Sequence, residues 1–376
     1  MPEIFISAGE ASGDLLAGAL AADMKKIRPD LNFFGLGGPA LRSVGTETLY
    51  DINNLGVVGF WEVAKKIGFF HQVFSRIKEE LQKRKPAMVL LVDYPGMNLR
   101  IAKLAKSMGI KVGYFVSPQF WAWKEKRIEA VKRYVDKMAV IFPFEVEFYQ
   151  KHGIEAEFFG HPILDLVKPE MPREEFFRRY GLDNRLPLVS FFPGSRKQQL
   201  EKHLPLVFQT LARLKSDGLR FQACWGLAPG ISKERAEEVL TGTGDLKIRI
   251  IEGERYSLMA ASSFALSSVG TVTLELALLQ TPFLIFYKTS PLTYFLAQRW
   301  IKLPYVGLVN LVAGEKIVSE FLQSAARPEK LAETAYFHLK EPLLSGRLKE
   351  KLGKVRQKLG QPGGLPKIAA SFCELV

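Results

Sequence analysis

The sequence predicts an α/β protein with two Rossmann-like, doubly wound domains that face each other across a cleft. Strand-like and helix-like segments alternate along the whole chain, which is the pattern of parallel sheets covered by helices. The chain has 376 residues, too many for one typical core and enough for two. The alternation restarts after a stretch with two prolines at 168–173, which we interpret as a linker.

The predicted domain borders follow from this linker. We place the first domain at residues 1–168 and the second at 169–361, and we expect a final helix at about 362–376 to pack back on the first domain. Ligands of such open sheets bind beyond the carboxyl ends of the strands, so we expect the site in the cleft. The strand candidates are residues 3–7, 32–34, 88–92, 111–116, 138–141 and 157–159 in the first domain, and 188–192, 221–224, 248–251, 264–266 and 283–286 in the second.

The composition limits the class of protein. Two cysteines without a C-x-x-C spacing favour a reducing compartment. The chain begins with a strand, so we expect no secretion signal, and its longest uncharged stretch is broken by Ser, Thr and Gly, unlike a membrane span. The net charge of +13 needs an anionic partner, either nucleic acid, an acidic membrane surface or a polyanionic substrate. Because the basic residues are scattered and no zinc-finger or RRM signature occurs, nucleic acid is the weakest of the three.

The loop after the first strand is a candidate for substrate contact. It contains Gly9, which permits close backbone approach, and the polar residues Glu10, Ser12 and Asp14. Ser12 could instead be the N-cap of a helix over 15–26, but that interpretation leaves Glu10 unexplained. A second glycine-rich loop, at 35–40, imitates a dinucleotide fingerprint, but a proline interrupts it and the expected acidic residue is misplaced, so we interpret it as a tight strand-to-helix turn.

The helix predicted over 60–81 has two different faces. Its apolar stripe, which should face the core, consists of Phe60, Val63, Ile67, Phe70, Phe74, Ile77 and Leu81. Trp61 and Phe69 fall on the opposite side, near Lys65 and Arg76. Aromatic residues mixed with cations suit an anionic membrane interface, although a helix covered on both faces would show the same pattern.

Asp93 is the candidate general base, because it ends a hydrophobic strand and a carboxylate at that edge faces the expected cleft. It could instead cap the helix over 98–108, a role that Asn98 could fill itself. Ser117, Trp121 and Trp123 also follow a strand, and the aromatic rings could bind sugar faces or acyl chains, or simply plug the space between the domains. His161 could contact substrate or fix the linker.

The second domain carries the candidate nucleotide site. Gly270, Thr271 and Thr273 form a small-residue turn into a helix over 272–279, which could offer backbone N–H groups to a phosphate. Glu275 lies one turn further and could accept hydrogen bonds from ribose hydroxyls, although an ordinary strand–turn–helix with a solvated glutamate would look the same. After another strand, the run Gly194, Ser195 and Arg196 supplies a cation for a diphosphate. Asn310 could reach the same cleft, or could be a turn residue.

Several motifs are missing from the sequence. It contains no Walker A sequence, no G-x-S-x-G elbow, no D-x-D pair and no cluster with metal-ligand spacing. We therefore expect no metal and no cofactor, and we expect Arg196 and backbone amides to meet the charge of a leaving group.

Together these motifs resemble the family of lipid-A-disaccharide synthases. The resemblance covers nearly the whole chain, and the G-E-A-S-G-D run followed by S-P-Q-F-W-A-W is its most specific part. The matching runs are G-E-A-S-G-D at 9–14, D-Y-P at 93–95, S-P-Q-F-W-A-W at 117–123, G-H-P at 160–162, P-G-S-R at 193–196, G-T-V-T-L-E at 270–275 and L-V-N-L-V-A-G at 308–314. One departure is Gly96, where the family often has a second acidic residue.

The resemblance implies a GT-B fold and an inverting glycosyl transfer in lipid A biosynthesis. UDP-2,3-diacylglucosamine would be the donor and 2,3-diacylglucosamine 1-phosphate (lipid X) the acceptor, at the cytoplasmic face of the inner membrane. Asp93 would take the proton of the acceptor's 6-hydroxyl, Glu10 and Ser12 would position the acceptor, and Glu275 would hold the ribose. The oligomeric state stays open, with a homodimer as one option. The alternatives are another UDP-sugar enzyme of this architecture, or a non-catalytic basic protein that binds lipid or nucleic acid.

Overall fold

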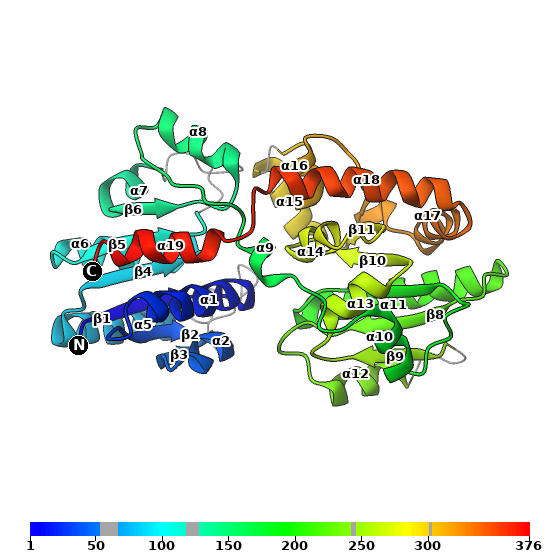
Figure 1. The fold of residues 1–376 in the computed structure, drawn as a ribbon, viewed down its shortest axis with the longest axis horizontal. Helices are drawn as coiled ribbons and strands as arrows, with labels where there is room; N and C mark the ends of the chain where they lie inside the picture. Colours follow the sequence, from blue (N-terminus) through cyan, green and yellow to red (C-terminus); the bar gives the residue numbers. More distant parts are fainter. Residues whose placement is uncertain (53–66, 118–127, 242–245, 301–302) are drawn as a thin grey trace. The chain divides into compact units, whose positions relative to one another are not determined.

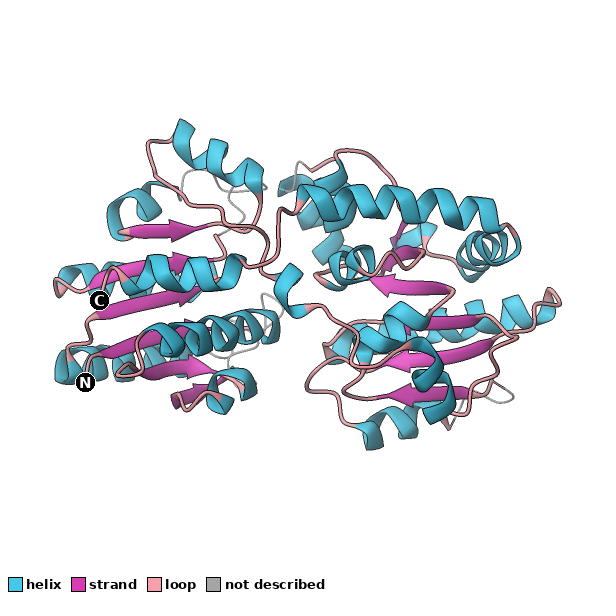
Figure 2. Cartoon of the chain, in the orientation of Figure 1, coloured by secondary structure: helices cyan, strands magenta, loops and turns pink. Residues whose placement is uncertain are grey.

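The computed structural model describes residues 1–52, 67–117, 128–241, 246–300 and 303–376. The chain forms two compact units (Figure 1). The first comprises Met1–Asp165 with the returning segment Gly360–Val376, and the second comprises Leu166–Leu359. The division falls within a few residues of the predicted border. In each unit a parallel sheet lies between layers of helices (Figure 2), so the predicted α/β architecture is confirmed.

The first unit is built on a six-stranded sheet with the order β3-β2-β1-β4-β5-β6. Every pair of neighbouring strands in it is parallel. The order reverses direction between β1 and β4, so the loops that follow these two strands lie side by side at the carboxyl edge. The strands are β1 (Glu3–Ala8), β2 (Asn32–Gly37), β3 (Glu47–Asp51), β4 (Met88–Val92), β5 (Lys111–Phe115) and β6 (Lys137–Ala139).

Helices cover both faces of this sheet. The chain end returns as α19, which packs on α1, and Figure 1 shows the two helices near each other (red and blue). The ring of Phe372 on α19 lies so close to Gly113 in β5 that a Cβ there would come within 2.8 Å of it. The helices are α1 (Ala11–Ile27), α2 (Pro39–Ser43), α5 (Ile67–Arg84), α6 (Pro95–Ser107), α7 (Ile128–Tyr134), α8 (Pro143–Lys151), α9 (Ile163–Leu166) and α19 (Gly364–Cys373).

The second unit repeats this plan with the strand order β12-β11-β10-β7-β8-β9. Here β7 and β10 are the neighbours at which the order reverses, so the loops after them are adjacent. The strands are β7 (Leu188–Phe192), β8 (Gln222–Gly226), β9 (Ile248–Ile251), β10 (Phe264–Ser268), β11 (Phe283–Tyr287) and β12 (Glu320–Leu322). The helices are α10 (Arg173–Arg179), α11 (Lys197–Ser216), α12 (Lys233–Leu240), α13 (Arg255–Ala261), α14 (Val272–Leu278), α15 (Pro291–Trp300), α16 (Leu308–Ala313), α17 (Pro328–Lys340) and α18 (Pro342–Lys358), with a 3-10 turn at Gln323–Ala325.

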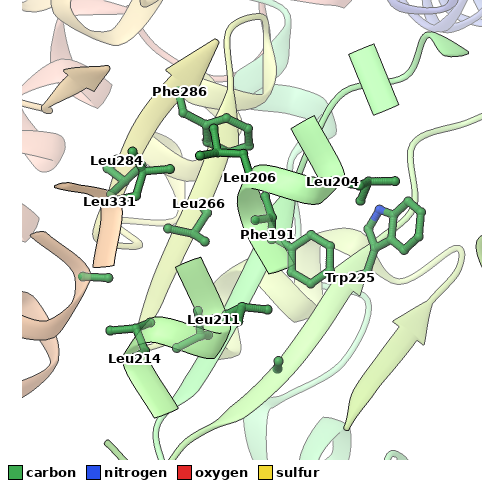
Figure 3. Packing of buried hydrophobic residues seen from close by; sticks show 14 of the residues in the cluster. Phe191, Leu204, Leu206, Leu211, Leu214, Trp225, Leu266, Leu284, Phe286 and Leu331 are labelled. Atoms are coloured by element: carbon green, nitrogen blue, oxygen red, sulfur yellow. The ribbon is translucent and has the colours of Figure 1, made fainter. Parts of the chain in front are cut away.

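The core of the second unit shows why these segments form these elements. The strand residues Phe191, Leu266 and Phe286 are fully buried. Leucines of α11 and Leu331 of α17 meet them from one face of the sheet (Figure 3). The buried strands therefore carry continuous apolar runs, whereas the helix contributes apolar residues at helical spacing.

The element predictions failed at the sheet edges. The edge strands β3 and β12 were not predicted, because both are short and carry acidic residues, as edge strands often do. The strand predicted at 157–159 is wrong, since Glu157 makes only an isolated bridge to Ala139.

The predicted membrane face of α5 also needs correction. Phe69 does not point outward, because it is half-buried and packs on the core beside Phe70 and Tyr50. Arg76 is exposed, but it pairs with Glu80 at 2.8 Å on its own helix. Trp61 and Lys65 lie outside the described residues.

Asp14 is structural and not a substrate contact, which corrects its predicted role. Its buried carboxylate accepts the backbone N–H groups of Gly38 at 2.6 Å, Ala40 at 2.9 Å and Leu41 at 3.3 Å. It thus occupies the N-terminus of α2, where an anion is favoured. The loop at 35–40 is a tight strand-to-helix turn, as predicted.

Replacing Asp14 with Ala should therefore destabilise the fold. The variant removes the side-chain acceptor of three backbone amides, two of them buried, and we expect a loss of about 2–4 kcal/mol in the free energy of unfolding. Urea unfolding measures this loss, with Asp30→Ala as control, because Asp30 forms an exposed ion pair with Arg28. A variant with unchanged stability but impaired substrate binding would restore the original prediction.

Candidate functional site

Asp93 sits in an unusual backbone turn at the end of β4. Asp93 and the following Tyr94 both adopt left-handed conformations, with φ of 51° and 47°. Each such residue costs about 1–2 kcal/mol when it is not glycine, so the surrounding structure must impose the turn. Backbone strain of this kind concentrates at functional sites.

Three buried side chains hold this turn. The carbonyl oxygen of Asp93 accepts hydrogen bonds from the Tyr114 hydroxyl at 2.6 Å and from Asn98 Nδ2 at 2.7 Å. Asn98 Oδ1 in turn accepts the Ser7 hydroxyl at 2.7 Å. Tyr114 lies on β5, Asn98 on α6 and Ser7 on β1, so three elements fix one peptide group. We call Ser7, Asn98 and Tyr114 the Asp93 clamp.

The loop after β1 packs directly on this turn. A Cβ placed at Gly9 would lie 2.2 Å from Cγ of Tyr94, so no side chain fits there. A Cβ at Gly13 would lie 3.9 Å from Cβ of Asp93. The first loop and the Asp93 turn therefore form one surface, as the adjacency of β1 and β4 requires.

The surroundings of Asp93 favour its protonated form. Burial raises the pKa of the Asp93 carboxyl to about 6, and the charge of Glu10 adds to the increase, while the backbone amide of Tyr94 opposes it. Glu10 is exposed and stands at the N-cap position of α1. A carboxylate with this pKa can accept a proton near neutral pH.

The other predicted residues of the first unit have mixed outcomes. Ser12 is exposed in the first turn of α1, and since Glu10 holds the N-cap position, the alternative of Ser12 as the cap is wrong. Ser117 is buried and donates to Glu145 Oε1 at 2.6 Å, which ties it to the scaffold. Trp121 and Trp123 lie outside the described residues.

His161 fixes the start of α9. Its Nδ1 accepts the backbone N–H of Ile163 at 3.1 Å, and burial lowers the pKa of the ring to about 3. The ring is therefore neutral, and its Nδ1 is used within the fold. Of the two predicted roles, the arrangement favours the fixing of the linker.

In the second unit, Glu275 combines an ion pair at one carboxylate oxygen with a buried second oxygen. The side chain is buried, with 5% exposed, and Oε1 accepts Nη2 of Arg255 at 2.7 Å. Oε2 is buried without a hydrogen-bond partner among the described residues. Burial raises the pKa of Glu275, and the Arg255 charge opposes this increase. A buried carboxylate oxygen without a donor is unfavourable, and a ligand hydroxyl would satisfy it.

The turn before α14 is open at Gly270. This residue has a φ of 142°, and a Cβ there would have no atom within 4 Å in the described structure. Thr271 stands at the N-cap position of α14. Thr273 does not face a ligand as predicted, because its N–H and its hydroxyl both donate to the carbonyl of Gly270, at 3.1 Å and 2.9 Å. The free space in this turn therefore lies beside Gly270.

The loop after β7 is organised by Gln199. Its Oε1 accepts the N–H groups of Ser195 and Arg196, both at 3.3 Å, and Gly194 has a φ of 116°. Ser195 and Arg196 are exposed at the N-terminus of α11. This loop follows β7, the neighbour of β10, so its cation lies at the same sheet edge as the turn at Gly270.

Asn310 is structural, which corrects its predicted contact with the donor. Its Nδ2 donates to the carbonyl of Val318 and to Glu320 Oε1, both at 2.8 Å. Its Oδ1 accepts the N–H groups of Ile317 at 3.0 Å and Val318 at 2.9 Å. The amide is fully used inside the fold, and nothing remains for a ligand.

Sequence reasoning missed Arg255 and the Asp93 clamp. Arg255 lies in the first turn of α13, where nothing in the sequence links it to Glu275. Tyr114 and Ser7 sit inside apolar strands, where a polar atom gives only a weak signal. No group of three or more metal-ligating side chains occurs among the described residues.

Comparison with known proteins gives a consistent result. A family model described as Lipid-A-disaccharide synthetase matches residues 4–362. Curated proteins named lipid-A-disaccharide synthase are similar over 99% of this chain: one from Geobacter sulfurreducens at 36% identity and one from Trichlorobacter lovleyi at 39%, each covered over 97% of its length, and one from Coxiella burnetii at 36%, covered over 98%.

Solved structures share the fold at low identity. UDP-GlcNAc 2-epimerase from Neisseria meningitidis, bound to UDP-GlcNAc, has a TM-score of 0.66 at 13% identity and covers 99% of this chain and 100% of its own. MurG from Acinetobacter baumannii has a TM-score of 0.55 at 14% identity, with 99% of both chains covered. These likenesses confirm the GT-B fold, and at this identity they say nothing more.

The close packing of Gly9 against Tyr94 can be tested by a substitution that adds one methyl group at Gly9. Gly9→Ala should lower the free energy of unfolding by about 1–3 kcal/mol, because the Cβ must displace the Tyr94 ring. Gly96→Ala is the matched control. A Cβ at Gly96 meets nothing within 4 Å among the described residues, and Ala is the better helix residue there. The free energy of unfolding of this variant should therefore rise by up to about 1 kcal/mol. Equal effects of the two substitutions in urea unfolding would contradict the packing described.

Proposed function

The chain belongs to the lipid-A-disaccharide synthetase family, and from this premise we propose how its two units divide the reaction. The enzyme is a glycosyltransferase that condenses UDP-2,3-diacylglucosamine with 2,3-diacylglucosamine 1-phosphate to give lipid A disaccharide 1-phosphate and UDP. The full-length similarity disfavours an epimerase, a transferase with another acceptor or a non-catalytic binding protein. The observation that carries our assignment of the catalytic residue is the strained turn at Asp93.

We propose that Asp93 is the general base of a direct displacement. Its carboxylate removes the proton of the acceptor's 6-hydroxyl. The oxygen attacks the anomeric carbon of the donor as the bond to the diphosphate breaks, so that UDP leaves with the bonding electrons and the configuration inverts. Its pKa of about 6 keeps Asp93 mostly ionised at neutral pH and still basic enough to accept the proton.

The donor is proposed to bind the second unit. The unpaired Glu275 Oε2 would accept the ribose hydroxyls, which would remove the penalty of its burial. The backbone N–H groups of Gly270 and Thr271 would donate hydrogen bonds to the diphosphate. Arg196 would neutralise its charge, and Gly194 and Ser195 of the same loop would contact it. This arrangement needs no metal, since amides and a guanidinium supply the positive charge.

The acceptor is proposed to bind the first unit beside Asp93. Glu10 and Ser12 are exposed at the start of α1, and Gly9 joins that loop to the Asp93 turn. Ser12 lies in the first turn of a long helix, which favours the acceptor's phosphate, and Glu10 could accept from sugar hydroxyls.

Both substrates carry acyl chains, so we propose that the enzyme works as a peripheral protein on an anionic membrane at its cytoplasmic face. The net charge of +13 supports this contact. No helix among the described residues combines the length and apolarity that a bilayer crossing demands. With Phe69 packed on the core, Arg76 is the one predicted membrane-facing residue left among the described residues of α5, and Trp61 and Lys65 lie outside the described part of the chain.

Replacing Asp93 with Asn tests the base. We expect the turnover number to fall by about 10²–10⁴-fold, since the amide cannot accept the proton, while UDP affinity stays unchanged. UDP release with both substrates, each omitted in turn, and calorimetric UDP titration measure the two quantities. Near-normal turnover would remove Asp93 from this role.

The same variant should be more stable than the wild type at neutral pH. The pKa of Asp93 is raised from its ordinary 3.8 to about 6, so its favourable contribution to folding is full below about pH 4 and is lost as the pH rises through 6. Asp93→Asn should therefore gain about 1–3 kcal/mol at pH 7.5 and nothing at pH 3.5. Equal stability at both pH values would argue against the raised pKa.

Glu275→Gln tests the ribose contact. The amide keeps the size of the side chain but weakens a charge-assisted bond, so the Kd of UDP should rise by about tenfold or more. The exposed Glu252→Gln is the control and should leave the Kd unchanged. Wild-type UDP affinity in a folded Glu275→Gln protein would exclude the contact.

A further inference from the structure

A row of exposed cations runs along one side of α18. Arg347, Lys351, Lys354 and Lys358 follow each other at spacings of four, three and four residues, which places them on one helical stripe. All four side chains are exposed. We call these residues the α18 stripe.

The helix that carries the stripe is firmly held. The adjoining face of the helix buries Leu348, Leu352 and Val355, and the helix packs on α14 and α16 of the same unit. Figure 1 shows α18 as one long helix at the border of this unit (orange to red). The stripe is therefore a fixed surface feature, presented by a helix that neighbours the proposed donor helix α14.

Apolar side chains stand at one end of the stripe. Leu343 and Leu344 in the first turn of α18 are 79% and 41% exposed, and Phe337 in the last turn of α17 is 52% exposed. Helical spacing puts Leu343 and Leu344 on either flank of the line that the cations follow. Large apolar residues so exposed next to cations are typical of surfaces that enter the interface of a bilayer.

The acidic residues near the α18 stripe do not cancel its positive charge. Glu350 is the one acid within α18, and Glu315 pairs with Lys351 at 3.7 Å with both side chains about half exposed, which is a weak interaction in water. Lys358 Nζ donates to the carbonyl of Ala313 at 2.6 Å and keeps its charge. Arg347 and Lys354 have no ion-pair partner within the described part of the chain.

We propose that the α18 stripe, with Leu343 and Leu344, is a docking surface for an anionic lipid bilayer. Phosphate headgroups would meet the four cations, and the two leucines would enter the acyl boundary. An RNA backbone would satisfy the cations but would leave the leucines exposed, so the combination favours lipid. This inference extends the proposed membrane contact to a named surface, and it does not depend on the roles of Asp93 or Glu275.

Vesicle flotation of the full-length protein tests the proposal. The wild type should float with vesicles of phosphatidylcholine and phosphatidylglycerol in equal amounts and much less with phosphatidylcholine alone. Neutralising the stripe with Arg347→Gln, Lys351→Gln, Lys354→Gln and Lys358→Gln should weaken binding by about 10- to 100-fold. Leu343→Ser with Leu344→Ser should weaken it while leaving its salt dependence in place.

The matched control neutralises four exposed cations elsewhere in the second unit, namely Lys202, Lys215, Arg220 and Lys233. Retained binding in this control, with loss in the stripe variant, supports the proposal. Equal loss in both variants, or wild-type flotation of the stripe variant, overturns it. Loss of RNA binding without loss of vesicle binding in the stripe variant would also overturn it.

An assay of UDP release in detergent micelles distinguishes the proposed membrane-docking surface from the proposed reaction. The stripe variant should release UDP at the wild-type rate from substrates held in detergent micelles, because it lacks only the bilayer contact. Loss of micellar turnover in that variant would mean that the stripe serves the reaction itself, and would overturn the proposal. Absence of turnover in the wild type would refute the reaction, while the flotation comparison would still decide the role of the stripe.

Discussion

The proposed catalytic site of the first unit depends on two hydrogen bonds to one carbonyl oxygen, that of Asp93. Without Tyr114 and Asn98 on that oxygen, two consecutive left-handed residues would relax and the carboxylate would turn away. The donors come from β5 and α6, and Ser7 of β1 orients Asn98. A doubly wound sheet brings these elements together only where its strand order reverses, so topology and strain act on the same residue.

The fold also closes some of its helix N-termini with its own carboxylates. Asp14 accepts the first amides of α2, and Glu320 accepts the N–H groups of Val306 and Gly307 before α16. At the turn before α14, by contrast, the described residues leave the space beside Gly270 open and give one buried oxygen of Glu275 no partner. This difference separates helix starts that stabilise the protein from the one that we assign to a nucleotide.

The buried strands could be predicted from the sequence more reliably than the roles of the polar residues. Continuous apolar runs such as β4 and β7 were predictable, and so were the turns that follow them, because those strands must be buried on both faces. Asp14, Thr273 and Asn310 were misassigned because a polar residue in a turn looks the same in sequence whether it meets a ligand or a backbone amide. Phe69 was misplaced by helical spacing alone, since α5 also packs against Tyr50 of β3, a strand that was not predicted. Arg255 needed the tertiary structure, which brings it to Glu275.

The fold holds Asp93 as a base whose pKa is raised to about 6. The most direct test is a ¹³C NMR titration of the aspartate side chains in the folded protein, with the Asp93 signal assigned by its absence from the Asp93→Asn variant. We expect an apparent pKa of about 6 for this carboxyl, lowered when Glu10 is replaced by Gln. If the carboxyl instead titrates near its ordinary 3.8 in the native protein, the fold does not prepare Asp93 as a base.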